Sequence, residues 1–295
     1  MTMFEIGFIG TGALGGALAG KLLQSGRRLT IYDADAKRRQ QMAEAGATVA
    51  SSARAVADAC EIAFVCLPAP AISRAVAEEI AGATRLRILV ECSTLGVKTM
   101  RDIADHLAQA QIAVLDCPVT GAAGGARGVD AGTFAFVCAG SDDIFARVDP
   151  LLRSLTARVH HVGTEPGMAQ IAKVINNALS ITALTVSCEA IVMGVKAGLN
   201  PSALIDALND GSGRNSATVD KFPRSILPRD FASPMSIGVK DMQLYMETIE
   251  AMGLPAPIGA AVMDIWNSAY AENPKRGYNS IVEYFERPAN VEVKG

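Results

Sequence analysis

The sequence is poor in aromatic residues and histidine, and it has no block of basic residues. Aromatic residues make up 5% of the 295 residues, one residue is tryptophan and three are histidine. The formal net charge is −3. Few aromatic side chains leave little for stacking on bases, and a slightly acidic chain has no electrostatic reason to bind nucleic acid or an anionic membrane. The histidines form no metal-binding pattern, so we expect neither a nucleic acid partner nor a metal.

Long apolar runs and closely spaced cysteine pairs are also missing. No stretch reaches the roughly 18 unbroken apolar residues that a membrane span needs. The nearest, 178–195, is interrupted by serine, threonine and Glu189. The six cysteines never occur as C-x-x-C, which favours buried, reduced thiols. Since the first residues lead directly into a glycine motif, without a basic segment or cleavage site, we expect a cytoplasmic protein that does not bind membranes.

The first half of the chain alternates short apolar runs with helix-like stretches. Half of all residues are hydrophobic, and a chain of this length suits about two domains. Several of the apolar runs are apolar on both faces, which is typical of a doubly wound parallel sheet covered by helices. The predicted strands are 4–9, 29–32, 62–67, 88–92, 114–117, 134–139 and 158–162. The predicted helices between them are 13–25, 36–45, 70–81 and 99–110.

The strand-like pattern ends after Gly163. Residues 166–196 predict one long helix, with proline in its first turn and Gly198 just past its end. Its apolar residues occupy more than one face, so we expect it to be buried in a core or a subunit interface. Further helices are predicted at 201–209, 237–252, 258–272 and 281–285. The sequence therefore predicts an α/β domain at 1–164 and an all-α domain at 165–295, with a long interdomain helix at its start.

A glycine-rich turn follows the first predicted strand and opens the first predicted helix. Its G-x-G-x-x-G pattern lets backbone N–H groups approach a pyrophosphate at a helix N-terminus. Asp33 ends the next predicted strand, 23 positions after Gly10. A carboxylate there accepts hydrogen bonds from the adenosine ribose and repels a 2′-phosphate, which indicates a Rossmann-type domain that binds NAD. The residues of the turn are Gly10, Thr11, Gly12, Ala13, Leu14 and Gly15.

The residues just after Asp33 leave NADP possible. Lys37, Arg38 and Arg39 are cations near the expected ribose site, where a cation can hold the 2′-phosphate of NADP. The same cations are typical of a solvated helix start. Asp35 adds negative charge beside Asp33, and this favours NAD.

Lys173 is the only charged residue between positions 165 and 189 of the long helix. A lysine on a mostly apolar helix has to find a carboxylate, extend its amine to water, or lose its proton as it is desolvated. Asn177 lies four positions later and therefore on the same face. This segment alone is equally compatible with a catalytic proton carrier and with a structural lysine.

Three further segments, together with the glycine turn, resemble the β-hydroxyacid dehydrogenases. This family includes 3-hydroxyisobutyrate dehydrogenase, tartronate semialdehyde reductase and, more distantly, 6-phosphogluconate dehydrogenase. Residues 116–122 read D-C-P-V-T-G-A, where the family commonly has D-A-P-V-S-G-G. Residues 163–177 fit the family pattern G-x-x-x-G-x-x-x-x-x-K-x-x-N-N, and 240–242 read K-D-M, where the family has K-D-L. The four motifs occur in the family's order and cover nearly the whole chain.

The resemblance implies a role for each motif. It implies that Lys173 is the general acid and base and that Asn177 orients the substrate. It implies that a substrate carboxylate binds at Thr120, Gly121 and Ala122. Threonine replaces the usual serine and alanine replaces the second glycine there, so the identity of the substrate stays open. The residues that the resemblance places at the cofactor, besides the glycine turn and Asp33, are Leu67, Pro68, Thr94 and Lys240.

The expected function is the NAD-dependent oxidation of a short β-hydroxyacid such as 3-hydroxyisobutyrate by a homodimer or homotetramer. An NADPH-dependent reductase of a small semialdehyde or 2-keto acid, similar to tartronate semialdehyde or glyoxylate, is an alternative. An imine reductase is disfavoured, because relatives with that activity usually replace the catalytic lysine. A dinucleotide-binding sensor without catalysis is a further alternative of another class.

Overall fold

The computed structural model describes residues 5–121 and 126–295. The chain forms two compact units, Met1–Lys173 (unit 1) and Val174–Gly295 (unit 2). The chain passes from unit 1 to unit 2 inside the long helix α8 (Met168–Lys196).

Unit 1 contains a sheet with the strand order β3-β2-β1-β4-β5-β6-β8-β7, and β9 pairs with β8. The strands from β3 to β6 are parallel and have the order 3-2-1-4-5-6 of a Rossmann-type sheet, which confirms the predicted fold. The strand predicted at 134–139 is present as β8, but it runs antiparallel to β6 and β7, a direction that the sequence did not predict. The strands are β1 (Glu5–Ile9), β2 (Arg28–Tyr32), β3 (Thr48–Val49), β4 (Ile62–Val65), β5 (Ile88–Glu91), β6 (Ala113–Asp116), β7 (Val119–Thr120), β8 (Ala135–Ala139) and β9 (Val159–Gly163).

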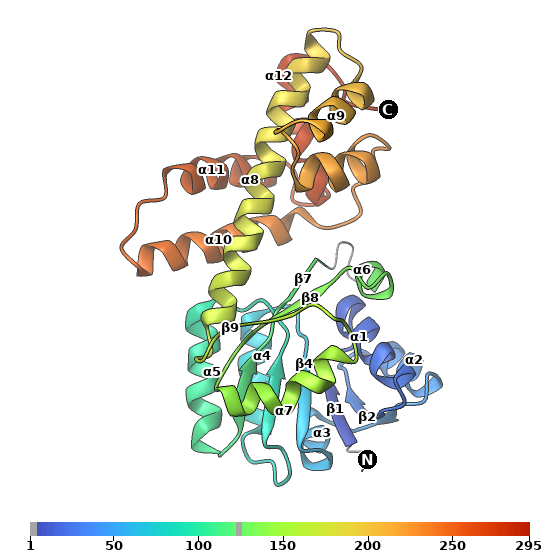
Figure 1. Ribbon diagram of the computed structural model, residues 1–295, viewed down its shortest axis with the longest axis vertical. Helices are drawn as coiled ribbons and strands as arrows, with labels where there is room; N and C mark the ends of the chain where they lie inside the picture. The colour runs from blue at the N-terminus through green and yellow to red at the C-terminus, as the bar shows by residue number, and fades with distance from the viewer. Residues whose placement is uncertain (1–4, 122–125) are drawn as a thin grey trace. The chain divides into compact units, whose positions relative to one another are not determined.

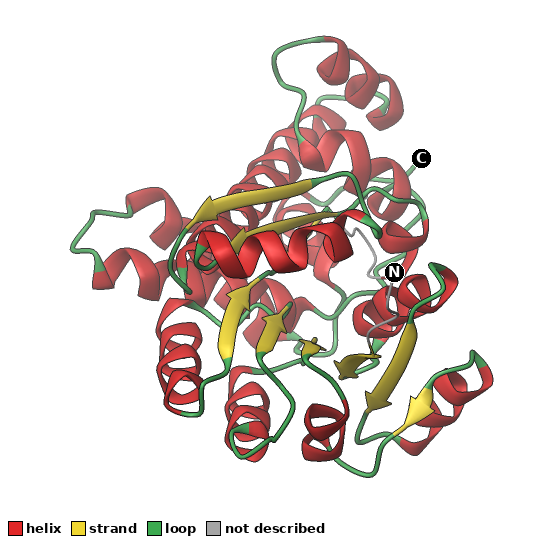
Figure 2. Cartoon of the chain, turned by 60° about the horizontal axis from the view of Figure 1, so that its bottom comes forward, coloured by secondary structure: helices red, strands yellow, loops and turns green. Residues whose placement is uncertain are grey.

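Helices cover both faces of this sheet (Figure 2). Neighbouring residues of β1 point to opposite faces: Phe8 stacks on Phe64 at 5.8 Å and packs with Leu18, whereas Ile9 packs in a separate cluster with Val56. Burial on both faces explains why the strands are apolar throughout. The helices of unit 1 are α1 (Ala13–Gln24), α2 (Ala36–Glu44), α3 (Ala53–Ala59), α4 (Pro70–Ile80), α5 (Val97–Gln109), α6 (Ala126–Asp130) and α7 (Asp142–Arg153).

Some elements differ from the sequence prediction. The strand predicted at 62–67 ends at Val65, and the Leu67 N–H donates to Ser93 Oγ at 2.8 Å instead of joining the ladder. Helices α3, α6 and α7 were not predicted. The six cysteines are free thiols, and all except Cys66 are buried.

The core of unit 2 is built around Trp266, which is fully buried. Its indole N–H donates to Thr185 Oγ1 of α8 at 2.9 Å. A Cβ at Gly238 would lie 2.1 Å from the Trp266 ring, so α10 can approach the ring this closely only with glycine at that position. The helices, several of them labelled in Figure 1, are α9 (Pro201–Asp210), the π-helix η1 (Ala217–Ile226), α10 (Met235–Ala251), α11 (Pro257–Glu272), the 3₁₀-helix η2 (Tyr278–Ile281) and α12 (Val282–Ala289).

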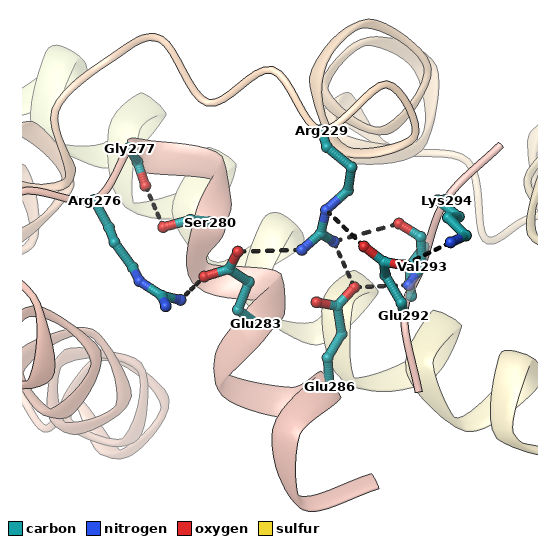
Figure 3. A network of polar contacts seen from close by, with 9 residues as sticks. All are labelled: Arg229, Arg276, Gly277, Ser280, Glu283, Glu286, Glu292, Val293 and Lys294. Carbon is teal, nitrogen blue, oxygen red and sulfur yellow. Dashed lines mark hydrogen bonds and ion pairs between the residues drawn. The ribbon is translucent and has the colours of Figure 1, made fainter. Parts of the chain in front are cut away.

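Arg229 binds side chains and backbone of the C-terminal segment of unit 2 (Figure 3). Its guanidinium lies 3.1 Å from a Glu283 oxygen and donates to Glu286 Oε1 at 2.7 Å. The same Glu286 oxygen accepts the N–H of Val293, a residue that is fully buried. A buried carboxylate with several donors thus ties residues far apart in the sequence to α12.

Helix α8 is long and apolar enough to cross a membrane by length and composition. Half of its most apolar window is nevertheless buried inside the protein, as in the core helix of a soluble protein. Burial therefore accounts for part of its composition, while Ile175, Leu179, Val186 and Met193 on the same helix are exposed.

Candidate active site

The glycine turn leaves no room for side chains at two of its positions. Gly10 has a φ of +88°, and a Cβ there would lie 2.4 Å from the carbonyl oxygen of Cys66. A Cβ at Gly15 would lie 2.0 Å from the carbonyl oxygen of Gly10. Gly12 caps α1 without a side chain, so the N–H groups of the first turn remain available to a phosphate. The turn therefore fits the pyrophosphate of a dinucleotide.

Asp33 is buried at the end of β2 and contacts this turn directly. Its Oδ2 accepts the Thr11 N–H at 2.7 Å, and its Oδ1 accepts the Asp35 N–H at 2.9 Å. Arg38 lies beside both carboxylates, 3.8 Å from Asp33 and 3.7 Å from Asp35. A cavity of about 360 Å³ is lined by Arg38, Gly12 and Thr11, among others. The structure thus places an acid and a cation together beside the turn.

Predicted cofactor residues lie at the carboxyl ends of neighbouring strands. Leu67 follows β4 and lies close to the glycine turn: a Cβ added to Gly10 would come within 2.8 Å of the Leu67 side chain. Thr94 follows β5 and is half-buried, whereas Pro68 is exposed. Strands β1, β4 and β5 are neighbours in the sheet, so the turn, Leu67 and Thr94 share the edge where open α/β sheets bind ligands.

The segment predicted to bind a carboxylate leaves the sheet at β7. Thr120 is half-buried and pairs with Ala135 of β8. Gly121 has a φ of +73°, and a Cβ there would lie 2.6 Å from the carbonyl oxygen of Thr133. The positive φ and the close carbonyl both require glycine at this position. Ala122 lies outside the described residues.

The first turn of α8 is held by two buried side chains that the sequence analysis did not single out. Asp116 Oδ2 accepts the N–H groups of Gly167 and Gln170 at 2.9 and 3.1 Å. The Gln170 amide donates to Asp116 Oδ1 at 2.7 Å. Lys173 lies three residues further along the helix and is half-buried. The sequence could have pointed to Asp116, because it is a charged residue at the end of an apolar strand. A buried carboxylate in that position needs hydrogen-bond donors.

A second carboxylate lies beside Asp116. Glu91 ends β5, is paired with Asp116 in the parallel register, and accepts the Ser93 N–H at 2.8 Å. Burial raises the pKa of Glu91 to about 7, and the neighbouring Asp116 acts in the same direction. Burial raises the pKa of Asp116 to about 6, against the opposing effect of its N–H donors.

Unit 2 carries the other predicted polar residues. The Asn177 amide donates to Asp241 Oδ2 at 2.9 Å, and the Lys240 ammonium lies 3.3 Å from Asp241 Oδ1. Asp241 is buried, so it fixes the orientation of Asn177. In the sequence, Asp241 is marked only as the middle residue of the K-D-M motif. The contact of Lys240 with a cofactor stays a prediction.

Within residues 5–121 and 126–295, no three His, Cys, Asp or Glu side chains form a group that could hold a metal ion. The glycine turn is the feature in this part of the chain that fits a cofactor.

Comparison with known proteins finds relatives that match nearly the whole of this chain. Residues 5–163 match the family described as the NAD binding domain of 6-phosphogluconate dehydrogenase. Residues 167–285 match the family described as NAD-binding of NADP-dependent 3-hydroxyisobutyrate dehydrogenase.

Individual relatives agree with these family matches. The chain is 30% identical to 3-hydroxyisobutyrate dehydrogenase of Pseudomonas aeruginosa, over 96% of this chain and 99% of that one. It is 28% identical to 2-(hydroxymethyl)glutarate dehydrogenase of Eubacterium barkeri, over 99% and 98%. Among solved structures, Mycobacterium tuberculosis 3-hydroxyisobutyrate dehydrogenase with L-serine has a TM-score of 0.86 at 25% identity, over 96% and 99%.

Proposed function

The chain belongs to the 3-hydroxyisobutyrate dehydrogenase family, and on that premise we propose that it oxidises short 3-hydroxy acids with a nicotinamide dinucleotide. The main observation in support of this proposal is the position of Lys173 at the start of α8. There Lys173 follows a helical turn that is tied to the ends of β5 and β6, at the sheet edge that also carries the glycine turn. A proton carrier and a dinucleotide turn on one edge are what hydride transfer from an alcohol requires.

The relatives suggest the substrate class. The compounds in their names, 3-hydroxyisobutyrate, 2-(hydroxymethyl)glutarate and serine, are all 3-hydroxypropanoates that differ in the substituent on carbon 2. The carboxylate and the primary hydroxyl are the shared parts. We therefore propose a 2-substituted 3-hydroxypropanoate as substrate and the corresponding semialdehyde as product.

Each residue has a defined task in this reaction. When bound, the dinucleotide supplies the redox chemistry by taking a hydride from the carbon that carries the hydroxyl. Lys173, with a neutral amine, accepts the hydroxyl proton, and in the reverse direction its ammonium returns that proton to the oxygen. Asn177, held by Asp241, orients the hydroxyl. The Thr120 hydroxyl and the N–H groups of Gly121 and Ala122 bind the carboxylate.

The cofactor is held at the glycine turn. The N–H groups at the start of α1, from Gly12 onward, bind the pyrophosphate, while Leu67, Pro68 and Thr94 line the nicotinamide side. The assignment of Lys240 to the cofactor rests on the family resemblance alone. We propose NAD as the preferred cofactor, because the Asp33 carboxylate lies beside the glycine turn and would repel the 2′-phosphate of NADP.

Replacing Asp33 by alanine is expected to raise the ratio of kcat/KM with NADP to that with NAD at least about tenfold, or about 1.4 kcal/mol. The substitution removes the repulsive carboxylate and frees Arg38 to bind the 2′-phosphate. Steady-state kinetics with both cofactors gives the ratio. In the double variant Asp33→Ala/Arg38→Ala the gain should be smaller, because the repulsive carboxylate is absent but no cation replaces it at the 2′-phosphate. An unchanged ratio in Asp33→Ala would remove Asp33 from the cofactor site.

A panel of 3-hydroxyisobutyrate, L-serine and 2-(hydroxymethyl)glutarate, each with NAD and NADP, tests the function itself. Formation of NADH with one of these acids is the expected result. Tight binding of NADH without turnover of any hydroxy acid or semialdehyde would instead support a sensor.

We also propose a soluble, cytoplasmic homodimer or homotetramer. Helix α8 exposes the apolar side chains of Ile175, Leu179, Val186 and Met193, which are 46–70% exposed and spaced so that they share one helix face. Covering this stripe with a second copy would remove apolar area from water. Light scattering would contradict the assembly if it gave the mass of one 30.8 kDa chain.

A further inference from the structure

We propose that Gln170 is a positioning residue of the reaction, whose side-chain amide fixes the first turn of α8, and with it Lys173, against the ends of β5 and β6. The inference rests on the proposed function, because it concerns the geometry of Lys173. It gives a role to a residue that is fully buried and whose side-chain contacts all lie within the protein.

Every polar atom of the Gln170 side chain is used. Its Oε1 accepts the N–H groups of Leu95 and Gly96 at 2.8 and 3.2 Å. Its Nε2 donates to the carbonyl oxygen of Ser93 at 3.1 Å and to Asp116 Oδ1 at 2.7 Å. The residue is fully buried, and exchanging its oxygen and nitrogen would set donors against donors. The amide therefore has a single orientation.

The contacts of Gln170 join three segments whose relative positions must be fixed for the proposed reaction. Ser93 to Gly96 form the loop after β5 that includes Thr94, proposed to line the cofactor. Asp116 ends β6, just before the proposed carboxylate loop. Lys173 follows Gln170 by three residues, less than one helical turn. One amide thus links the cofactor loop, the substrate loop and the proton carrier.

Asp116 reinforces this arrangement at the helix start. It accepts the backbone N–H groups of Gly167 and Gln170 in addition to the Gln170 amide, and all of these contacts are buried. A carboxylate at a helix N-terminus also interacts favourably with the helix dipole. Without the Gln170 amide, the backbone contacts would keep α8 close to β6, but the loop after β5 would lose its connection to the helix. A misplacement of about 1 Å is enough to cost roughly 100-fold in rate.

Two substitutions test the proposal. Gln170→Leu fills the same space and removes all four hydrogen bonds, and Gln170→Glu keeps the shape but replaces the NH₂ donor by a carboxyl oxygen. We expect kcat to fall at least tenfold in both at pH 8, while the dissociation constant of NADH, measured by fluorescence titration, changes less than threefold. Gln109→Glu makes the same charge change at the exposed end of α5 and should behave like the parent.

The pH profile of Gln170→Glu separates positioning from general damage to the fold. In this variant, the protonated carboxyl at position 170 can again donate a hydrogen bond to Asp116. The ionised carboxylate at position 170 has no proton to donate and lies next to the carboxylate of Asp116. The kcat of this variant relative to the parent should therefore rise more steeply as the pH falls from 8 to 6 than the kcat of Gln170→Leu, which lacks the carboxyl at position 170. Asp116, Glu91, the Arg101 guanidinium near Gly167 and Lys173 also surround the site in all three proteins. Because the Gln170 amide lowers the pKa of Asp116, and both variants lose that amide, the difference between the profiles of Gln170→Glu and Gln170→Leu isolates the carboxyl at position 170.

The outcomes separate this inference from the proposed function. Parental kcat in folded Gln170→Leu, or a pH-independent deficit in Gln170→Glu, would overturn the positioning role while the parent enzyme remains active. If Gln170→Leu fails to fold, Gln170→Glu alone decides. A parent without turnover, or a fully active Lys173→Ala variant, would instead contradict the proposed function.

Discussion

Replacing Lys173 by alanine is expected to lower kcat by about 10²–10⁴-fold, the range that general acid–base catalysis contributes. The substitution removes the group that takes the hydroxyl proton, and no other charged side chain lies between positions 165 and 189 to replace it. Binding of NADH should persist, because the glycine turn lies between β1 and α1 and Asp33 follows β2, whereas Lys173 lies in α8. Stopped-flow or steady-state assays with 3-hydroxyisobutyrate measure the loss, and fluorescence titration measures the binding.

Two further variants test this prediction: Lys173→Arg keeps the charge at the site, and Lys196→Ala is a control on the same helix. Arginine keeps the positive charge but does not lose its proton in proteins, so Lys173→Arg should be nearly as inactive as the alanine variant. Lys196 lies on the same helix, where its ammonium donates to the Ala289 carbonyl oxygen, and its replacement should leave kcat unchanged. If Lys173→Arg kept most of the activity, the residue would act through its charge and not as a base. A kcat within threefold of the parent in Lys173→Ala would exclude both roles.

The sequence was sufficient for the features that depend on neighbouring residues. The glycine turn follows an apolar strand and opens a helix, and Asp33 ends the next strand, so local pattern and spacing predicted the Rossmann-type unit. Proline and glycine also marked the limits of the long helix to within two residues of its start.

The sequence did not predict features that depend on distant or unusual contacts. The partners of Gln170 on the β5 loop lie 74–77 positions away, and no local pattern connects them. The π-helix η1 contains Pro223, and proline normally argues against a helix interior. Helix α3 has seven residues, too few for a clear period. The part missed at the candidate site is the set of contacts that holds Lys173 in place.

The paired buried carboxylates predict an unusual dependence of stability on pH. An unfolded chain releases the proton of Glu91 near its ordinary pKa of 4.5, whereas burial in the folded state raises that pKa to about 7. Between these values the folded state binds more protons, so the free energy of unfolding falls as the pH rises. Asp116, whose pKa burial raises from 3.8 to about 6, acts in the same direction. The contribution of Glu91 is on the order of 3 kcal/mol, fully present below pH 4.5 and lost above pH 7.

Glu91→Gln should remove about half of this dependence, because Asp116, with a pKa shift of similar size, still contributes. Glutamine keeps an oxygen that can accept the Ser93 N–H but carries no proton to lose. We therefore expect a flatter free energy of unfolding between pH 5 and 8, and a variant that gains stability relative to the parent as the pH rises. Urea unfolding followed by far-ultraviolet circular dichroism is the measurement, because the single tryptophan, Trp266, reports on unit 2. Glu61→Gln changes an exposed carboxylate and should keep the parental slope. A parental slope in Glu91→Gln would mean that Glu91 is not the group that destabilises unit 1 at neutral pH.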